Sequence, residues 1–293
     1  MSQSELEEEL VVGVIGGSGL YEIDGLEDLK EVKLATPFGE PSDAFVTGRL
    51  GDTRMVFLPR HGRGHRLTPS ELNFRANIWG FKRLGVTRIL SISAVGSLRE
   101  DMHPGDFVVI DQFIDRTRHR KDTFFGDGVV AHVMFADPVC EHVRQALLAS
   151  AAEVGVKSHD GGTYVNMEGP QFSTRAESNL YRSWDAEVIG MTNLQEAKLA
   201  REAEICYATV AMVTDFDCWH EGHDDVTVEA VIKVMGENVA SARRLVAAAV
   251  PHLDAKRSCP CRNALQYAIM TDPQQIPQQA KDRLELLIGR YLP

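Results

Sequence analysis

Two acidic residues, one position apart, follow an apolar run in the stretch VAMVTDFDCW at 210–219. Asp215 and Asp217 project to the same side if the chain stays extended, because successive side chains of a strand alternate between faces. Two neighbouring carboxylates raise the pKa of at least one of them, which makes a carboxylic acid available near neutral pH. The pattern therefore indicates a site for proton transfer. The alternative is a pair of acids that cap a helix or close a turn after the strand.

Basic side chains gather in the stretch FLPRHGRGHR at 57–66, which holds Arg60, His61, Arg63, His65 and Arg66 among glycines. Arginine offers a forked, permanently charged donor to phosphate, so an anion site is the first hypothesis for this loop. A solvated basic loop is the alternative. Metal binding by His61 and His65 is a third hypothesis, and the glycines argue against it, because a spacing of four brings two ligands together only on a helix.

Small or polar residues end three other apolar runs. In VVGVIGGSGLYE at 11–22, the dinucleotide motif fails because Glu22 stands at its last glycine position; the amides and the Ser18 hydroxyl are left to hold a small anion or to close a plain turn. Ser93 is placed for an anion or a sugar hydroxyl. Glu168 and Phe172 could supply a carboxylate for ribose or water and a ring that stacks on a base, or else a turn residue and a core residue. We expect one crevice at the carboxyl edge of a sheet.

The elements that position these residues are apolar, β-branched runs that alternate with segments of helical period. This alternation predicts a layered α/β fold with a covered central sheet. The predicted strands lie at 11–17, 44–50, 54–60, 88–94, 106–112, 163–168, 187–192 and 206–215.

Caps predict the helix boundaries. The clearest helix is predicted to start at Thr68, with Pro69 and Glu71 in its first turn, and to stop at Gly85. Three further helices are predicted: one after the capping box of Thr174 and Glu177, one across 137–155 and one across 227–250.

The overall composition is that of an ordinary globular chain, with 293 residues, 44% hydrophobic and 25% charged. The net charge of −11 argues against a nucleic-acid binder, which needs a broad basic face. The opening stretch MSQSELEEEL lacks the pattern of a secretory signal, and no apolar run reaches the roughly 20 residues that cross a bilayer. We therefore expect a cytoplasmic protein with neither nucleic-acid nor membrane partners.

The composition becomes polar and proline-rich after Asp254. We expect one domain at 1–253 and a helical appendage at 254–293, packed on the same domain or on a neighbouring subunit. The appendage contains CPC at 259–261, two of five cysteines, an odd number that fits a reducing compartment. Since only His252 lies near it in sequence, CPC fits neither a four-ligand zinc site nor a CxxC redox pair. We expect it to be structural, as a strained disulfide or as inert thiols.

Together these motifs resemble the purine nucleoside phosphorylase and methylthioadenosine phosphorylase family. The similarity runs from about Val11 to about Leu253 and rests on GVIGGSGLYE, TPFGEPSDA, PRHGRGH, NFRANIWGFK, SAVGSLRE, PGDFVVIDQFIDRT, EGPQFSTRAES, MT and VTDFDCW. The resemblance implies a three-layer α/β/α fold with a central mixed, largely parallel twisted sheet, and phosphorolysis of a purine nucleoside to base and ribose 1-phosphate. It also implies a homotrimer or homohexamer, phosphate as co-substrate, and neither a metal nor an organic cofactor.

The resemblance assigns roles to individual residues. It implies that phosphate is surrounded by Ser18, Arg60, His61, Ser93, Ala94 and Thr192. It places Met191 against the ribose, Phe172 against the base, Glu168 and Val231 in the substrate site, and Ser173 and Val228 near positions that shape substrate choice. It identifies His132 as the residue that a neighbouring subunit lends to the 5' pocket.

The resemblance implies that the acidic pair contacts the base. Adenine presents an amino donor and a ring nitrogen that must be protonated as the glycosidic bond breaks, so one carboxylate accepts from the amino group while the other gives its proton to the base. We favour Asp217 for the ring nitrogen and Asp215 for the amino group, and the mirrored assignment stays open. Family members that act on 6-oxopurines place Asn in this region, so TDFD favours adenine and 5'-methylthioadenosine as substrate.

Three alternatives are left open by the sequence. The substrate could be adenosine or methylthioinosine. Water could replace phosphate, which would make the protein a hydrolase. The chain could also be a non-catalytic nucleoside or phosphate sensor on the same fold.

Overall fold

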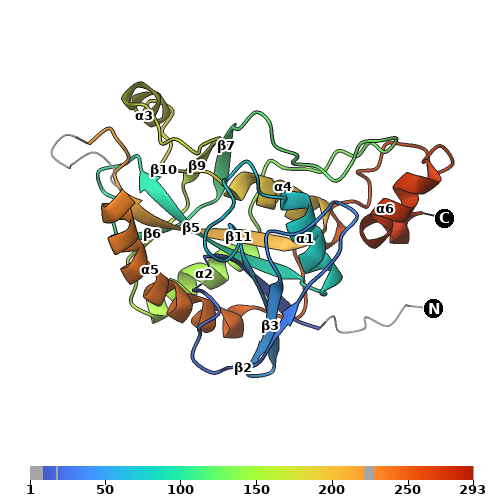
Figure 1. Ribbon diagram of the computed structural model, residues 1–293, viewed down its shortest axis with the longest axis horizontal. Helices are drawn as coiled ribbons and strands as arrows, with labels where there is room; N and C mark the ends of the chain where they lie inside the picture. The colour runs from blue at the N-terminus through green and yellow to red at the C-terminus, as the bar shows by residue number, and fades with distance from the viewer. Residues whose placement is uncertain (1–8, 18, 221–227, 293) are drawn as a thin grey trace.

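The computed structural model describes residues 9–17, 19–220 and 228–292, of which 228–233 by backbone alone. Within these residues eleven strands form one sheet, with helices on both of its faces (Figure 1). The strands are β1 (Val11–Gly16), β2 (Leu26–Val32), β3 (Phe45–Leu50), β4 (Thr53–Pro59), β5 (Arg88–Ser97), β6 (Phe107–Val109), β7 (Gln112–Arg116), β8 (Ser158–Asp160), β9 (Thr163–Met167), β10 (Val188–Gly190) and β11 (Cys206–Asp215). The helices are α1 (Phe74–Arg83), α2 (Glu141–Glu153), α3 (Arg175–Arg182), α4 (Asn193–Glu202), α5 (Val228–Ala249) and α6 (Gln278–Ile288), with short 3-10 turns at Val250–His252, Pro260–Asn263 and Gly289–Tyr291.

The sheet branches at β5. β5 pairs in parallel with β1 over Arg88–Ser91 and in parallel with β11 over Arg88–Gly96, and its carboxyl end pairs antiparallel with β10. One path continues from the branch through β10, β9 and β7, and the other through β11, β6 and β8. Six of the ten pairings among the described strands are parallel, which confirms the mixed, largely parallel sheet.

The central strands are buried on both faces and so contribute to two apolar clusters. In β1, Val12 and Val14 belong to the cluster that α2 and α5 complete, whereas Val11 and Ile15 belong to the cluster that α1 and α4 complete. This arrangement explains why the strand is apolar at successive positions rather than at alternate ones. It confirms the three-layer α/β/α fold.

The C-terminal segment packs on the same chain. Leu284, Leu287 and Ile288 of α6 join the second cluster, which also contains Phe124. Figure 1 shows α6 at the end of the molecule opposite α3. None of the helices in the described ranges is both long enough and apolar enough to cross a membrane.

Helix α1 begins later than the sequence predicted. Its N-cap is Asn73, whose side chain accepts from the Ala76 amide at 3.2 Å. The Thr68 amide does donate to Glu71 Oε2, at 2.9 Å, but this pair closes a turn ahead of the helix. The prediction of a helix start at Thr68 is therefore wrong, because a capping-box contact forms without helix behind it. Gly85, at φ +82°, follows the helix end as predicted.

Three strands were not predicted: β2, β7 and β8. The side chains of β2 are mostly exposed, so no apolar alternation marks it, and its position is fixed by backbone pairing with β3. β7 and β8 are short and largely polar. The capping box of Thr174 and Glu177 is confirmed at the start of α3, and the predicted helices at 137–155 and 227–250 correspond to α2 and α5.

Candidate active site

The acidic pair lies at the carboxyl end of β11, and a turn brings it together. β11 ends at Asp215, after a register shift against β5. Asp217 has φ +50°, in the left-handed region, and its backbone N–H donates to Asp215 Oδ1 at 2.8 Å. The extended alternation that the sequence suggested is therefore wrong. The two residues nevertheless lie together, since both border Gly96, where a Cβ would meet Asp215 Oδ1 at 2.9 Å and Asp217 Cβ at 3.3 Å.

The two carboxylates differ in their hydrogen bonds. Asp215 accepts from the Asp217 amide through Oδ1, and its Oδ2 lies 2.7 Å from the Thr214 hydroxyl. Asp217 Oδ2 is buried and has no hydrogen-bond partner among the described residues. Burial raises the pKa of both carboxyls, and the nearby Asp215 carboxylate raises the pKa of Asp217 further. Asp217 therefore retains its proton more readily than an exposed acid and has an oxygen available to a ligand.

Arg60 is held in a buried ion pair. Its Nε donates to Glu196 Oε1 at 2.5 Å, its Nη2 donates to Ser91 Oγ at 2.7 Å, and its Nη1 donates to the Ile92 carbonyl at 2.9 Å. Arg60 is 4% exposed and Glu196 is fully buried. Burial alone lowers the pKa of Arg60, but the Glu196 carboxylate more than offsets this. Since Nη1 has one described acceptor, its second hydrogen is the donor that remains for an anion.

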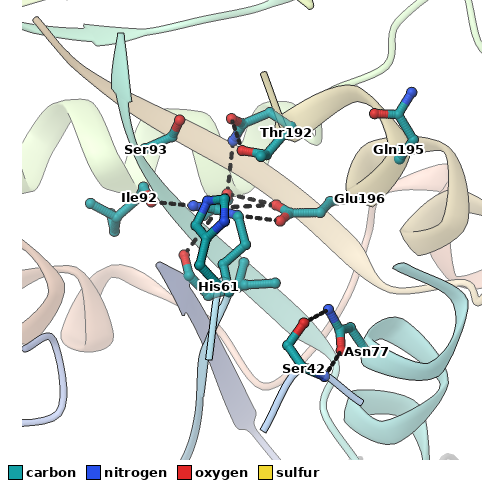
Figure 2. A network of polar contacts seen from close by, with 12 residues as sticks. Ser42, His61, Asn77, Ile92, Ser93, Thr192, Gln195 and Glu196 are labelled. Carbon is teal, nitrogen blue, oxygen red and sulfur yellow. Dashed lines mark hydrogen bonds and ion pairs between the residues drawn. The ribbon is translucent and has the colours of Figure 1, made fainter. Parts of the chain in front are cut away.

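Glu196, in the first turn of α4, is the centre of this network (Figure 2). Its Oε2 also accepts from Ser91 Oγ and from the Tyr207 hydroxyl, each at 2.9 Å. Asn193 Nδ2 lies 2.9 Å from Ser91 Oγ and 3.1 Å from the Tyr207 hydroxyl. None of these four residues was predicted from the sequence, and a Glu on a helix such as Glu196 suggests an exposed surface residue. The helix sequence NLQEAKLARE is mixed in polarity and gives no signal that Glu196 is buried.

Ser93, Ala94 and Thr192 lie around the same network. Ser93 and Ala94 belong to β5, and Thr192 is the N-cap of α4. Figure 2 shows Ser93 and Thr192 near Glu196 and His61. The Thr192 hydroxyl makes no capping hydrogen bond and donates to Asn193 Oδ1 at a long 3.4 Å, so an anion at the helix N-terminus could take this donor instead.

His61 is a neutral imidazole at physiological pH. Its Nδ1 lies 2.8 Å from the Leu67 carbonyl, which can only accept, so Nδ1 carries the proton and Nε2 does not. Burial, with a smaller contribution from the charge of Arg60, lowers the pKa of His61 to about 4, although the Leu67 hydrogen bond acts in the opposite direction. His61 stacks on His65 at 4.4 Å between ring centroids. In the described part of the chain neither histidine belongs to a metal-ligand cluster.

Glu168 is bonded to other parts of the protein. Its carboxylate accepts from the Arg118 amide at 2.6 Å, from Arg120 Nε at 3.3 Å and from the Ser70 hydroxyl. Burial alone would raise the pKa of Glu168, but these hydrogen bonds hold it below its ordinary value. Arg120 also donates to the Met191 carbonyl, which links this loop to the start of α4. The Glu168 carboxylate is therefore already hydrogen-bonded within the protein when no ligand is bound.

The remaining candidates are placed as follows. Phe172 is 51% exposed, which excludes the core position considered above. Ser173 Oγ lies 3.6 Å from Met167 Sδ, next to the loop of Phe172. His132 is exposed, and its amide donates to the Ala268 carbonyl at 2.9 Å. Ser18 lies outside the described residues, and Val228 and Val231 lie in α5 with side chains outside the description.

Residues 11–251, which carry this fold and these strand ends, match the model of the phosphorylase superfamily. The chain belongs to the phosphorylase superfamily. Within this superfamily it is 62% identical to the S-methyl-5'-thioadenosine phosphorylase of Geobacter sulfurreducens, over 97% of this chain and 100% of that protein. It is 58% identical to the protein of the same name in Koribacter versatilis, over 96% of each.

Solved structures of phosphorylase superfamily members share the fold. A methylthioadenosine phosphorylase from an antarctic soil metagenomic library is 47% identical, with a TM-score of 0.91 over 96% of this chain and 99% of that chain. The methylthioadenosine phosphorylase of Schistosoma mansoni, in complex with adenine, is 39% identical, with a TM-score of 0.81 over 88% of this chain and 96% of that chain. The likeness therefore extends across nearly all of the molecule.

Proposed function

We propose that this phosphorylase cleaves 5'-methylthioadenosine with inorganic phosphate, giving adenine and 5-methylthioribose 1-phosphate in purine and methionine salvage. The observation that carries the proposal is the partly buried acidic pair, in which the buried Oδ2 of Asp217 has no partner among the described residues. Two relatives named S-methyl-5'-thioadenosine phosphorylase, at 62% and 58% identity, support the choice of substrate. The Schistosoma mansoni relative is solved with adenine, the base that the proposed reaction releases.

Phosphate is the nucleophile in this proposal. Ser93, Ala94 and Thr192 would hold it beside the N-terminus of α4, with the remaining Nη1 hydrogen of Arg60. Neutral His61 would contribute a site next to Arg60 without adding charge. As the bond from C1' to the base stretches, the ribose gains positive charge, and the bound phosphate both stabilises that charge and attacks C1'.

The acidic pair handles the leaving base. When the glycosidic bond breaks, its electron pair goes to adenine, and a proton on a ring nitrogen neutralises the charge. We assign this proton to Asp217, whose raised pKa favours the protonated form and whose Oδ2 lacks a described partner. Asp215 would accept from the amino group of adenine. The buried ion pair of Arg60 and Glu196 fixes the phosphate side while the acids act on the base side.

The other substrate contacts remain proposals of the same kind. We infer that Met191 contacts the ribose and that exposed Phe172 covers the base. Ser173 and Val228 would shape substrate choice, and Val231 would line the substrate site. Glu168 would act through the position of its loop, because Arg118, Arg120 and Ser70 engage its carboxylate. No organic cofactor is needed for these steps.

We also propose that the chain works as a homotrimer or homohexamer. His132 lies on a ribbon formed by 129–133 and 268–270, which includes the bridge between Ala131 and Ile269. Large apolar side chains are exposed on or next to this ribbon: Val130, Met134, Tyr267 and Met270. A second copy that covers them would bring His132 to its neighbour's site. Mass measurement in solution, with His132→Ala tested for a higher KM for methylthioadenosine at unchanged oligomer size, separates the two parts of this proposal.

The cytoplasm remains the expected compartment. All five cysteines are free thiols in the structure, and thiols stay reduced there.

The reaction is tested by release of adenine from 5'-methylthioadenosine with and without phosphate. We expect release that depends on phosphate, faster than release of base from adenosine, inosine or methylthioinosine. Release at the same rate without phosphate would contradict the proposal and support a hydrolase. Tight binding of adenine with no turnover in phosphate buffer would support a sensor.

A further inference from the structure

Four of the five cysteines lie together at the amino end of β11. Their sulfur atoms are all within 4.8 Å of one another. The four residues, Cys140, Cys206, Cys259 and Cys261, are buried, with at most 8% of any of them exposed. Cys218, the fifth cysteine, is half-buried and lies outside this group, which we call the cysteine cluster.

The sulfur distances fit shared coordination better than disulfides. Cys206 Sγ and Cys259 Sγ are 3.3 Å apart, and none of the four is bonded to another. A disulfide needs about 2.05 Å. A zinc ion bound to four sulfurs at about 2.3 Å places them about 3.8 Å from one another at the corners of a tetrahedron. We propose that the cysteine cluster binds one structural Zn²⁺ ion.

The backbone fixes the cluster from three separate parts of the chain. Cys140 is the N-cap of α2, and its amide donates to the Tyr207 carbonyl at 2.8 Å. Cys206 starts β11, and its amide donates to the Thr87 carbonyl at 3.1 Å. Cys259 and Cys261 flank Pro260 at the 3-10 turn of the C-terminal segment. The positions of the ligands are therefore set before any ion binds.

The surroundings suit the charge of such a site. Binding replaces four thiol protons with one Zn²⁺, so four protons leave and the site carries a net charge of −2. Basic side chains are concentrated in a small cavity lined by Cys206 and Cys259: Arg88, His142, His252, Lys256 and Arg257. This cavity also gives an entry path for the ion.

The site is structural, because it is far from the acidic pair. Cys206 and Asp215 are the two ends of β11, and a strand of that length spans about 30 Å. Zinc would join the start of α2, the start of β11 and the C-terminal segment. Structural tetrathiolate sites of this kind contribute directly to folding stability.

The sequence prediction for CPC rested on a wrong premise. It considered ligands close in sequence, where His252 was the sole candidate. The fold instead brings Cys140 and Cys206 to Cys259 and Cys261.

The test is the metal content of the untagged full chain, purified in reductant and passed through metal-free buffer. We expect about one zinc per chain in the wild type. In Cys206→Ser and Cys259→Ser the zinc content should fall at least about tenfold. Cys218→Ser is the matched control and keeps its zinc. Where the serine variants fail to fold, a mercurial titration of the wild type serves instead, and it should release one zinc for four thiols.

Two results would overturn the proposal. One is a metal-free chain, either with five reactive thiols after denaturation or with an intact mass that lacks four hydrogens, which indicates two disulfides. The other is iron at the same stoichiometry, which would replace zinc as the occupant.

In the wild type, removal of the metal with a chelator should lower the melting temperature by several degrees.

Discussion

The two ends of β11 hold groups that differ in burial and in their partners: the acidic pair is partly buried, whereas the cysteine cluster is buried. At the carboxyl end, Asp215 and Asp217 are neighbours in sequence, and one carboxylate oxygen has no partner in the described part of the chain. At the amino end, Cys206 lies 3.3 Å from a cysteine 53 residues later, in a group of four buried cysteines whose sulfur atoms are within 4.8 Å of one another. Buried polar atoms are nearly always paired, so the unpaired oxygen marks the place for a ligand. The cysteine cluster, in contrast, joins three separate parts of the chain.

The largest effect is expected at the carboxyl end. Asp217→Asn removes the proposed proton donor and should lower kcat for methylthioadenosine by about 100- to 10,000-fold. Phosphate affinity, zinc content and melting temperature should change little, because the side chain is not part of those networks. Steady-state kinetics with a phosphate binding measurement checks this. Asp215→Asn is the comparison variant, and an equal or larger loss there would reverse the assignment within the pair.

The buried ion pair of Arg60 and Glu196 tests whether the carboxyl edge also contains groups that stabilise the fold. Glu196→Gln leaves Arg60 buried without its counter-charge, and the free energy of unfolding should fall by about 3–5 kcal/mol. Asp101→Asn is the control: it breaks the exposed pair of Arg99 and Asp101, which should cost at most about 1 kcal/mol. Urea unfolding without phosphate measures both. Equal effects for the two variants would refute the role given to Glu196.

A third prediction concerns Glu204, close to the amino end of β11. Its carboxylate accepts from the Leu265 amide at 3.0 Å, from the Tyr291 hydroxyl at 2.6 Å and from Arg290 at 2.6 Å. Glu204→Ala leaves the buried Leu265 amide without its acceptor. The free energy of unfolding should therefore fall by about 2 kcal/mol, while kcat stays the same. Thermal unfolding and initial rates decide this. A variant of wild-type stability with reduced kcat would mean that the two ends are not separate in function.

The smallest effect is expected from a single phosphate contact. Ser93→Ala removes one hydroxyl donor, which should raise the KM for phosphate about tenfold, in line with about 1.5 kcal/mol for a hydrogen bond to a charged group. Ser93→Thr keeps the hydroxyl and should stay near the wild type. The KM for methylthioadenosine serves as the internal reference, and an equal rise in both constants would argue against a phosphate contact.

The sequence was sufficient for the buried central strands, but it did not predict the buried helix α4. β1, β5 and β11 are apolar because both of their faces are covered, and each was predicted from that pattern. β2 could not be predicted in this way, since its side chains are mostly exposed and its pairing uses the backbone. The start of α1 was misplaced because the contact of Thr68 with Glu71 also forms in a turn.

The candidate site shows the same limit. Asp215 and Asp217 were predicted to lie together because they are close in the chain, although the geometry is a turn. Glu196 was missed because its burial depends on Arg60, which comes from another strand end. The cysteine cluster was missed because its members are distant in sequence and none of them is distinctive alone. Clusters whose residues are far apart in sequence can be recognised only in the folded structure.

The most direct test of the account is the pH dependence of kcat/KM for methylthioadenosine, measured for the wild type and for Asp217→Asn at saturating phosphate. Burial and the Asp215 charge raise the pKa of Asp217, so its protonated, active form is present at low pH and is lost as pH rises through that pKa. The account predicts a rate that is level below this pKa and falls above it in the wild type, and a low rate without that fall in the variant. The same falling limb in both proteins would contradict proton donation by Asp217.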